Sequence, residues 1–231
     1  AKEEDIKNVS LPITGQIKYN GTRVIARIDG DVVTFKTRNG HQFSHPELAD
    51  IIKETSFRDK CIWDGELTFG DSQGENHARV SGIVNSAIKG TPIPRYLGLV
   101  FNTFDFMTIE EFDAAECHKT YRERYHNLQN SFLPSKFMKV AETLEFTETA
   151  QIQAKFNEVL ANRYEGLILK AWDHKYTFKR SKDWIKLKAI KDATLEVLNI
   201  IPGEGKYEGM IGALQCDGIV EGKHVIVNVG S

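Results

Sequence analysis

Residues 23–45 carry the pattern that most restricts the fold of this chain. Two runs rich in β-branched residues, Val24–Ile28 and Val32–Phe35, are separated by Asp29-Gly30, and Asn39-Gly40 follows shortly afterwards. Asp-Gly and Asn-Gly favour tight hairpin turns, because the turn positions require positive φ angles that these residues tolerate. The stretch therefore predicts consecutive antiparallel strands.

The rest of the chain alternates short strands with helical patterns. Residues 46–55, 81–90, 108–130 and 147–162 are predicted helical, and 61–69, 97–106, 166–170 and 183–189 are predicted strands. From residue 193 onwards, short apolar runs are broken by glycines, which is typical of a small β-barrel. We therefore expect an α+β fold dominated by antiparallel sheet in residues 1–189, and the start of a small barrel in residues 190–231.

Composition narrows the class of protein. The chain has 231 residues, of which 41% are hydrophobic and 27% charged, as in ordinary soluble globular proteins. It lacks an apolar run long enough to span a membrane and a secretory signal, so we expect a cytoplasmic protein without a membrane partner. Its 3 cysteines are scattered, so the sequence predicts neither a disulfide framework nor a zinc site.

The formal net charge of −2 argues against a protein that coats nucleic acids nonspecifically, but positive charge is concentrated locally. Between residues 175 and 191 there is one acid, Asp183. The basic residues of this strip are Lys175, Lys179, Arg180, Lys182, Lys186, Lys188 and Lys191. A phosphate-binding site and a solvated charged edge both fit this strip.

Lys18-x-x-Gly21 is a candidate for nucleophilic chemistry, although the pattern is weak by itself, and Lys206-x-x-Gly209 also matches it. Two acids strengthen the case for a catalytic role of Lys18, because Glu66 and Glu165 each stand at the start of an apolar strand. Carboxylates in such positions can hold Mg²⁺ against a triphosphate. A simple turn between strands is the alternative for Asp64-Gly-Glu66.

Lys186 and Lys188 are spaced so that both side chains project from one face of a strand, while Leu187 faces the core. Two neighbouring ammonium groups repel each other unless an anion lies between them, so phosphate is the expected ligand. An exposed strand face is the other interpretation. Phe104 is equally compatible with a place in the core and with stacking on a purine.

Taken in order, these segments resemble the motif series of the covalent nucleotidyltransferases, which comprise ATP-dependent DNA ligases, RNA ligases and mRNA capping enzymes. The resemblance spans residues 16 to 189. Its elements are Lys18-x-x-Gly21, Arg38, Asp64-Gly-Glu66, Phe104-Asp105, Glu165-Gly166 and Trp184-Ile-Lys-Leu-Lys188. Residues 81–91 and 204–213 are similar to segments of DNA ligases of the T-even phage type, the second of them to the opening of their OB domain.

The resemblance implies a mechanism and a role for each site residue. The amine of Lys18 would attack the α-phosphate of ATP and keep AMP as a phosphoramidate, with Lys186, Lys188 and Mg²⁺ or Mn²⁺ stabilising the phosphate charge. The remaining nucleotide contacts implied are Gln16 and Ile17 at the adenine edge, Phe104 stacked on adenine, Arg23 and Glu66 at the ribose, Arg38 at phosphate, and Glu165, with Glu66, near the metal.

The substrate implied is nicked double-stranded DNA, bound by a monomer, in the host cytoplasm if the chain is encoded by a phage. ATP is preferred to NAD⁺ for two reasons. Few residues precede Lys18, and the cysteines of the zinc module carried by NAD⁺-dependent ligases are not in place.

Two departures from the family pattern leave alternatives open. Asn20 stands where DNA ligases usually carry an aspartate, and the last basic motif of the family is not found before Ser231. An RNA ligase, some of which lack that aspartate, is therefore one alternative. An inactive module that binds nicks is another, and a capping guanylyltransferase, which would use GTP, is a third.

Overall fold

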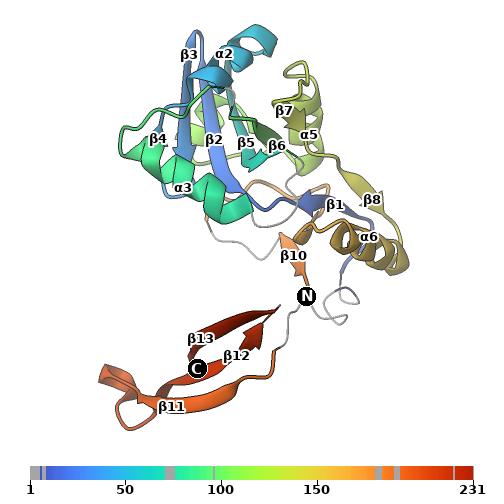
Figure 1. Cartoon of the computed structure of the whole chain (residues 1–231). Helices are drawn as coiled ribbons and strands as arrows, with labels where there is room; N and C mark the ends of the chain where they lie inside the picture. The colour runs from blue at the N-terminus through green and yellow to red at the C-terminus, as the bar shows by residue number, and fades with distance from the viewer. Residues whose placement is uncertain are drawn as a thin grey trace. The chain divides into compact units, whose positions relative to one another are not determined.

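The computed structural model describes residue 6 and residues 9–70, 76–95, 97–179, 184–189, 193–220 and 222–230. The chain divides into two compact units, Ala1–Ala189 and Ile190–Ser231 (Figure 1). The first unit contains two sheets and the helices that cover them, and it confirms the mixed α and β class expected from the sequence.

The larger sheet of the first unit has six strands in the order β4-β3-β2-β5-β6-β7. Their bounds are β2 Thr22–Asp29, β3 Val32–Thr37, β4 Gln42–Phe43, β5 Lys60–Phe69, β6 Leu99–Met107 and β7 Met138–Val140. Neighbouring strands are antiparallel except for β6 and β7, which are parallel. The predicted hairpin is β2–β3, and Gly30 in its turn has a φ of 60°.

The smaller sheet has four antiparallel strands in the order β10-β9-β1-β8. These are β1 Ile13–Lys18, β8 Leu144–Phe146, β9 Gly166–Lys170 and β10 Ile185–Lys188. The register places Lys18 opposite Gly166, and Gly166 opposite Lys188. The sheet thus brings together three segments that are far apart in the sequence.

Each sheet has its own hydrophobic core. The helices α2 (Pro46–Thr55), α3 (Asn76–Ile88) and α5 (Tyr121–Gln129) contribute Ile52, Val84 and Leu128 to the core of the six-stranded sheet. Helix α6 (Thr149–Ala161) packs Ile152 and Phe156 against the four-stranded sheet (Figure 1). No helix in the described part of the chain has the length and apolar character needed to cross a bilayer.

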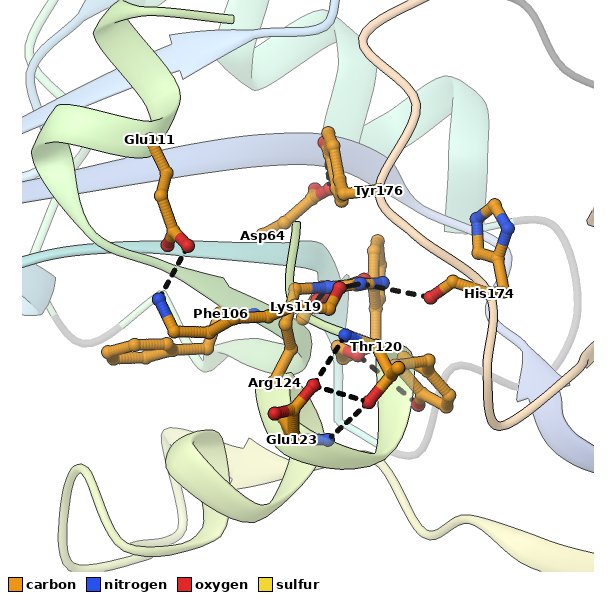
Figure 2. Close-up of polar contacts among 12 residues, drawn as sticks. Asp64, Phe106, Glu111, Lys119, Thr120, Glu123, Arg124, His174 and Tyr176 are labelled. Atoms are coloured by element: carbon orange, nitrogen blue, oxygen red, sulfur yellow. Dashed lines mark hydrogen bonds and ion pairs between the residues drawn. The ribbon is translucent and has the colours of Figure 1, made fainter. Parts of the chain in front are cut away.

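One helix prediction was wrong. Residues 108–130 form two helices, α4 (Ile109–Asp113) and α5, rather than a single one. Thr108 and Thr120 each begin a helix with a capping box, in which the threonine hydroxyl accepts a hydrogen bond from the backbone N–H of a glutamate three residues later. The pairing of Thr120 with Glu123 is drawn in Figure 2. Because a capping box marks the start of a helix, the box formed by Thr120 and Glu123 makes α5 a helix separate from α4.

The second unit contains a three-stranded antiparallel sheet in the order β11-β12-β13. Its strands are β11 Glu196–Pro202, β12 Ile211–Val220 and β13 Lys223–Gly230, with a short 3₁₀ turn, η1, at Gly205–Tyr207. The small barrel expected from the sequence remains a prediction.

Candidate active site

A cavity of about 940 Å³ in the first unit is lined by residues of both sheets and of α3. It contains every residue that the sequence predicted for the site. These are Gln16, Ile17, Lys18, Asn20, Arg23, Arg38, Glu66, Phe104, Glu165, Lys186 and Lys188. The structure therefore brings the predicted residues together, while the role of each remains a prediction. Of the predicted basic strip, Arg180, Lys182 and Lys191 lie outside the described residues.

Lys18, at the end of β1, shares the carboxylate of Glu165 with Lys188. The amine of Lys18 donates a hydrogen bond to Glu165 Oε2, and Lys188 Nζ lies 2.5 Å from Glu165 Oε1. Burial raises the pKa of Glu165, but the hydrogen bonds from Lys18 and Lys188 outweigh it, so this pKa is lowered overall. A single carboxylate thus holds two amines in place at one end of the cavity.

Gly166 explains how Glu165 comes so close to both lysines. Its φ is 149°, and a Cβ added to it would lie 1.9 Å from the backbone oxygen of Leu187. A side chain at this position would force β9 and β10 apart, so only glycine allows this approach. The glycine after Glu165 is therefore required by strand packing.

Lys186 adds a third amine on the same face of the sheet. It pairs with Ile168, whereas Lys188 pairs with Gly166, so both lysines project toward the cavity. Burial lowers the pKa of Lys186, and the nearby charges of Arg38, Lys18, Lys188 and Arg23 lower it further. Like charges that repel one another in this way are stabilised when a polyanion, such as a triphosphate, binds between them.

Arg23 is held by acceptors from the protein. Its guanidinium donates to both oxygens of the fully buried Asp64, at 2.9 and 2.5 Å, and to the hydroxyl of Tyr176 at 3.0 Å. The attraction of Asp64 raises the pKa of Arg23. Tyr176 in turn donates to Asp64, and Figure 2 shows the two side chains together. Any contact of Arg23 with a ligand is thus made by an arginine whose orientation is already fixed.

Glu66 lines the cavity on the opposite sheet from Glu165. Burial raises the pKa of Glu66 to about 7, although the charge of Lys18 opposes this. Within the described ranges, no three acidic, histidine or cysteine residues are clustered for a metal ion. The two carboxylates of Glu66 and Glu165 nevertheless fit Mg²⁺, which usually binds one or two carboxylates and takes phosphate oxygens and waters as its other ligands.

The far end of the cavity is more aromatic. Phe104 is half-buried, and its ring meets the edge of Trp184 with the ring centroids 5.9 Å apart. The amide of Gln16 donates to Thr143 Oγ1 at 2.8 Å and to the Ala141 carbonyl oxygen at 3.4 Å. This end therefore combines flat apolar surface with oriented polar groups, as a nucleobase pocket requires.

The sequence prediction missed several residues of the cavity wall. These include His77, Ser81, Ile168, Lys170 and Trp184. Ile168 and Lys170 could have been found, because they alternate with Gly166 along β9 and so share its face of the sheet. His77 could not, since its contact with the backbone oxygen of Gly21 joins a helix to a distant loop.

Comparison with known proteins identifies the family. Residues 1–188 match the model of the ATP dependent DNA ligase domain, and the chain belongs to this family. The DNA ligase of Thermococcus onnurineus is 26% identical over 210 residues, which cover 86% of this chain and 36% of that protein. The chain thus spans about a third of the length of this curated relative.

Solved ligase structures share the fold. The Chlorella virus DNA ligase-adenylate has a TM-score of 0.59 and 17% identity, covering 99% of this chain and 79% of that one. The ATP-dependent DNA ligase of bacteriophage T7, in complex with ATP, also has a TM-score of 0.59 and 17% identity, with 99% and 78% covered. At these identities the likeness concerns the fold alone.

Proposed function

We propose that this chain is the core of an ATP-dependent DNA ligase that seals nicks in duplex DNA through an AMP adduct on Lys18. The observation that carries the proposal is the position of the Lys18 amine. It lies beside Glu165, in a cavity that Lys186, Lys188 and Arg38 also line. A nucleophile surrounded by phosphate-binding charge suits attack on a nucleotide phosphate.

In the first step, the Lys18 nitrogen forms a bond to the α-phosphorus of ATP while the bond to pyrophosphate breaks. The Lys18 ammonium gives up one proton before it attacks, and Glu165, which already accepts a hydrogen bond from it, is the nearest acceptor. The nitrogen loses a second proton to solvent as the phosphoramidate forms and keeps one hydrogen. Lys186 and Lys188 stabilise the charge that develops on the phosphate oxygens. Arg38, in the turn that follows β3, contacts the outgoing phosphates.

In the next two steps AMP passes from Lys18 to the 5′-phosphate at the nick, and the 3′-hydroxyl attacks that phosphate and releases AMP. Phe104 stacks on adenine and Gln16 and Ile17 contact its edge, while Arg23 and Glu66 contact the ribose. Glu66 and Glu165 are the candidate ligands of Mg²⁺ or Mn²⁺. The metal would neutralise phosphate charge when it is bound.

The proposal extends to the whole molecule. Residues 1–189 form the nucleotidyltransferase domain, and residues 190–231 the start of an OB-fold domain. Nicked DNA is bound mainly through its phosphates, so binding weakens with salt. The protein acts as a monomer in the cytoplasm, and the similarity of residues 81–91 and 204–213 to T-even ligases supports a phage-type enzyme.

The intact mass after incubation with ATP and Mg²⁺ tests the first step. We expect a gain of one AMP with ATP, none with GTP, and none for Lys18→Ala. A GTP adduct would instead indicate a capping enzyme. If no adduct forms, pre-adenylylated nicked DNA separates the remaining possibilities, because a working ligase core closes it and an inactive nick-binding module does not.

Asn20 is the one site residue that argues for a different substrate or a slower enzyme. An asparagine keeps the shape of aspartate but lacks its charge, so it is a weaker base and metal ligand. We therefore predict that Asn20→Asp speeds nick sealing while adduct formation on Lys18 changes little. Single-turnover sealing of an all-DNA nick measures the change, and a nick with RNA on the 3′-hydroxyl side tests the RNA ligase alternative. Sealing no faster in Asn20→Asp than in the unmodified chain would contradict the prediction.

A further inference from the structure

His77, near the start of α3, lines the cavity but has no part in the steps proposed above. Its side chain is largely exposed, and its Nδ1 atom lies 2.5 Å from the backbone oxygen of Gly21. A carbonyl oxygen can only accept a hydrogen bond, so Nδ1 must carry the hydrogen and donate it. The contact therefore fixes which ring nitrogen of His77 is the donor.

Gly21 is buried, and it is held by β5 as well as by α3. Its backbone N–H donates to the carboxylate of Glu66, and a Cβ added to it would lie 2.2 Å from the backbone oxygen of Leu67. A side chain at position 21 would push the loop away from β5, so the close approach depends on the glycine. The N–H of Gly21 is thus fixed by Glu66 and its carbonyl group by His77.

A second contact joins the same loop to α3. The hydroxyl oxygens of Thr22 and Ser81 lie 2.9 Å apart. His77 and Ser81 are four residues apart in the helix, so their side chains lie on one face of α3. This face therefore meets two consecutive residues, Gly21 and Thr22.

The residues held in this way link the nucleophile to the six-stranded sheet. Strand β1 ends at Lys18 in the four-stranded sheet, and β2 begins at Thr22 in the six-stranded sheet. Residues 19–21, which include Asn20, form the whole of this link. A displacement of Gly21 would therefore move both Lys18 and Asn20 within the cavity.

We propose that His77 is a positioning residue, which holds the carbonyl group of Gly21 and thereby keeps Lys18 in place for the transfer of AMP. The inference rests on the proposed function, because it concerns the reaction assigned to Lys18. The donor of His77 is already used within the protein. Its role is thus to fix the geometry of residues 19–21, and the nucleotide is contacted by other side chains.

The test uses two variants of similar size, His77→Asn and His77→Leu. The amide nitrogen of asparagine can take the place of Nδ1 and donate to Gly21, whereas leucine has no donor. The rate of AMP transfer to Lys18 is measured over a range of ATP concentrations.

In His77→Leu, we expect the rate at saturating ATP to fall about 10- to 100-fold, because a small misplacement of a reacting group is costly. The ATP concentration that gives half the maximal rate should stay nearly unchanged, and His77→Asn should recover most of the rate. His126→Leu, at an exposed histidine of α5, is the matched control and should keep the full rate.

Thermal unfolding checks that the variants are folded, and His77→Ala replaces His77→Leu if the leucine variant is not. A full rate in the folded variant would overturn the inference. Equal losses in His77→Asn and His77→Leu would also overturn it, as would a loss that higher ATP concentrations restore. The imidazole would then act on the nucleotide itself.

The amide of Gly21 gives a measurement that does not depend on activity. Because this N–H is bonded to Glu66, its hydrogen exchange should be faster in His77→Leu than in the unmodified chain, and unchanged in His77→Asn. If the unmodified chain forms no adduct, the proposed function fails at this step, and exchange at Gly21 decides the inference. Equal exchange in all three chains would show that His77 does not hold the loop.

Discussion

The two sheets that line the cavity treat charge in opposite ways. On the six-stranded sheet, the buried acids are paired within the protein, Asp64 with Arg23 and Asp105 with Arg124. On the four-stranded sheet, Lys18 and Lys188 share the single carboxylate of Glu165, and Lys186 adds further positive charge. The two fully buried acids of the first sheet are neutralised by these pairs when the chain folds, whereas the second sheet retains an excess of positive charge.

The charged residues of the two sheets therefore have different roles: one set fixes side-chain positions, and the other is available to bind a ligand. A buried pair with well-formed hydrogen bonds fixes the positions of its own side chains, as the Asp64–Arg23 pair does at the cavity wall. A group of amines with too few acids destabilises the folded chain through mutual repulsion. A bound anion such as phosphate relieves this repulsion, and the relief contributes to its binding free energy. Variants that remove one partner on each sheet should therefore behave differently.

The largest effect is expected for Asp105→Asn. Both Asp105 and Arg124 have fully buried side chains, with Arg124 Nε 2.7 Å from Asp105 Oδ1 and Nη2 3.1 Å from Oδ2. Arg124 also donates to the backbone oxygens of Lys119 and His174, the second of which is drawn in Figure 2. Removal of the acid leaves a buried guanidinium unpaired, so we expect a loss of about 3–5 kcal/mol of unfolding free energy.

The matched change on the other sheet is Glu165→Gln, which affects a partly exposed pair. Exposed ion pairs contribute less than about 1 kcal/mol, so its effect on stability should be small. Urea unfolding measures both variants. If Asp105→Asn and Glu165→Gln lost equal amounts of unfolding free energy, the ion pairs of the two sheets would not differ in their contribution to stability.

The second prediction concerns a neutral group on the six-stranded side. His45 precedes α2, its Nδ1 accepts from the backbone N–H of Leu48, and its ring packs against Phe35. Burial lowers the pKa of His45 from 6.5 to about 4. Between these values the unfolded chain binds a proton that the folded chain does not, so stability is full above pH 6.5 and falls as the pH drops toward 4.

The difference in pKa corresponds to an upper limit of about 3 kcal/mol. We expect His45→Asn, which keeps a capping oxygen, to flatten this part of the stability profile. Urea unfolding at a series of pH values measures it in both chains. An unchanged slope in the variant would show that other groups cause the acid sensitivity.

Local patterns in the sequence were enough to predict much of this structure. The β2–β3 hairpin follows from its turn residues, and Lys186 and Lys188 share a face because strand side chains alternate. The break between α4 and α5 was also present in the sequence, as threonine–glutamate pairs at 108 and 111 and at 120 and 123. The prediction of one helix over 108–130 overlooked these pairs.

Contacts between distant segments could not be predicted in this way. Arg23 meets Tyr176 across 153 residues, and nothing near either residue indicates the other. Lys170 illustrates the same limit, because a lysine at the end of a strand is usually exposed. Its burial depends on Tyr121 and Trp184, which come from other parts of the chain and which only the folded structure brings to it.

The smallest expected effect tests the four-stranded sheet directly. If its excess positive charge is relieved by phosphate, pyrophosphate should raise the thermal stability of the chain, by about 1.4 kcal/mol at ten times its dissociation constant. Lys186→Met should reduce this gain without lowering stability in the absence of ligand, because burial and, after it, the neighbouring positive charges both disfavour the charge of Lys186 and lower its pKa. Lys36→Met, an exposed position on β3, is the control and should keep the whole gain. An equal rise in thermal stability in potassium chloride of the same ionic strength would mean that general screening, rather than a bound anion, relieves the repulsion. The four-stranded sheet would then resemble the six-stranded one in needing no ligand.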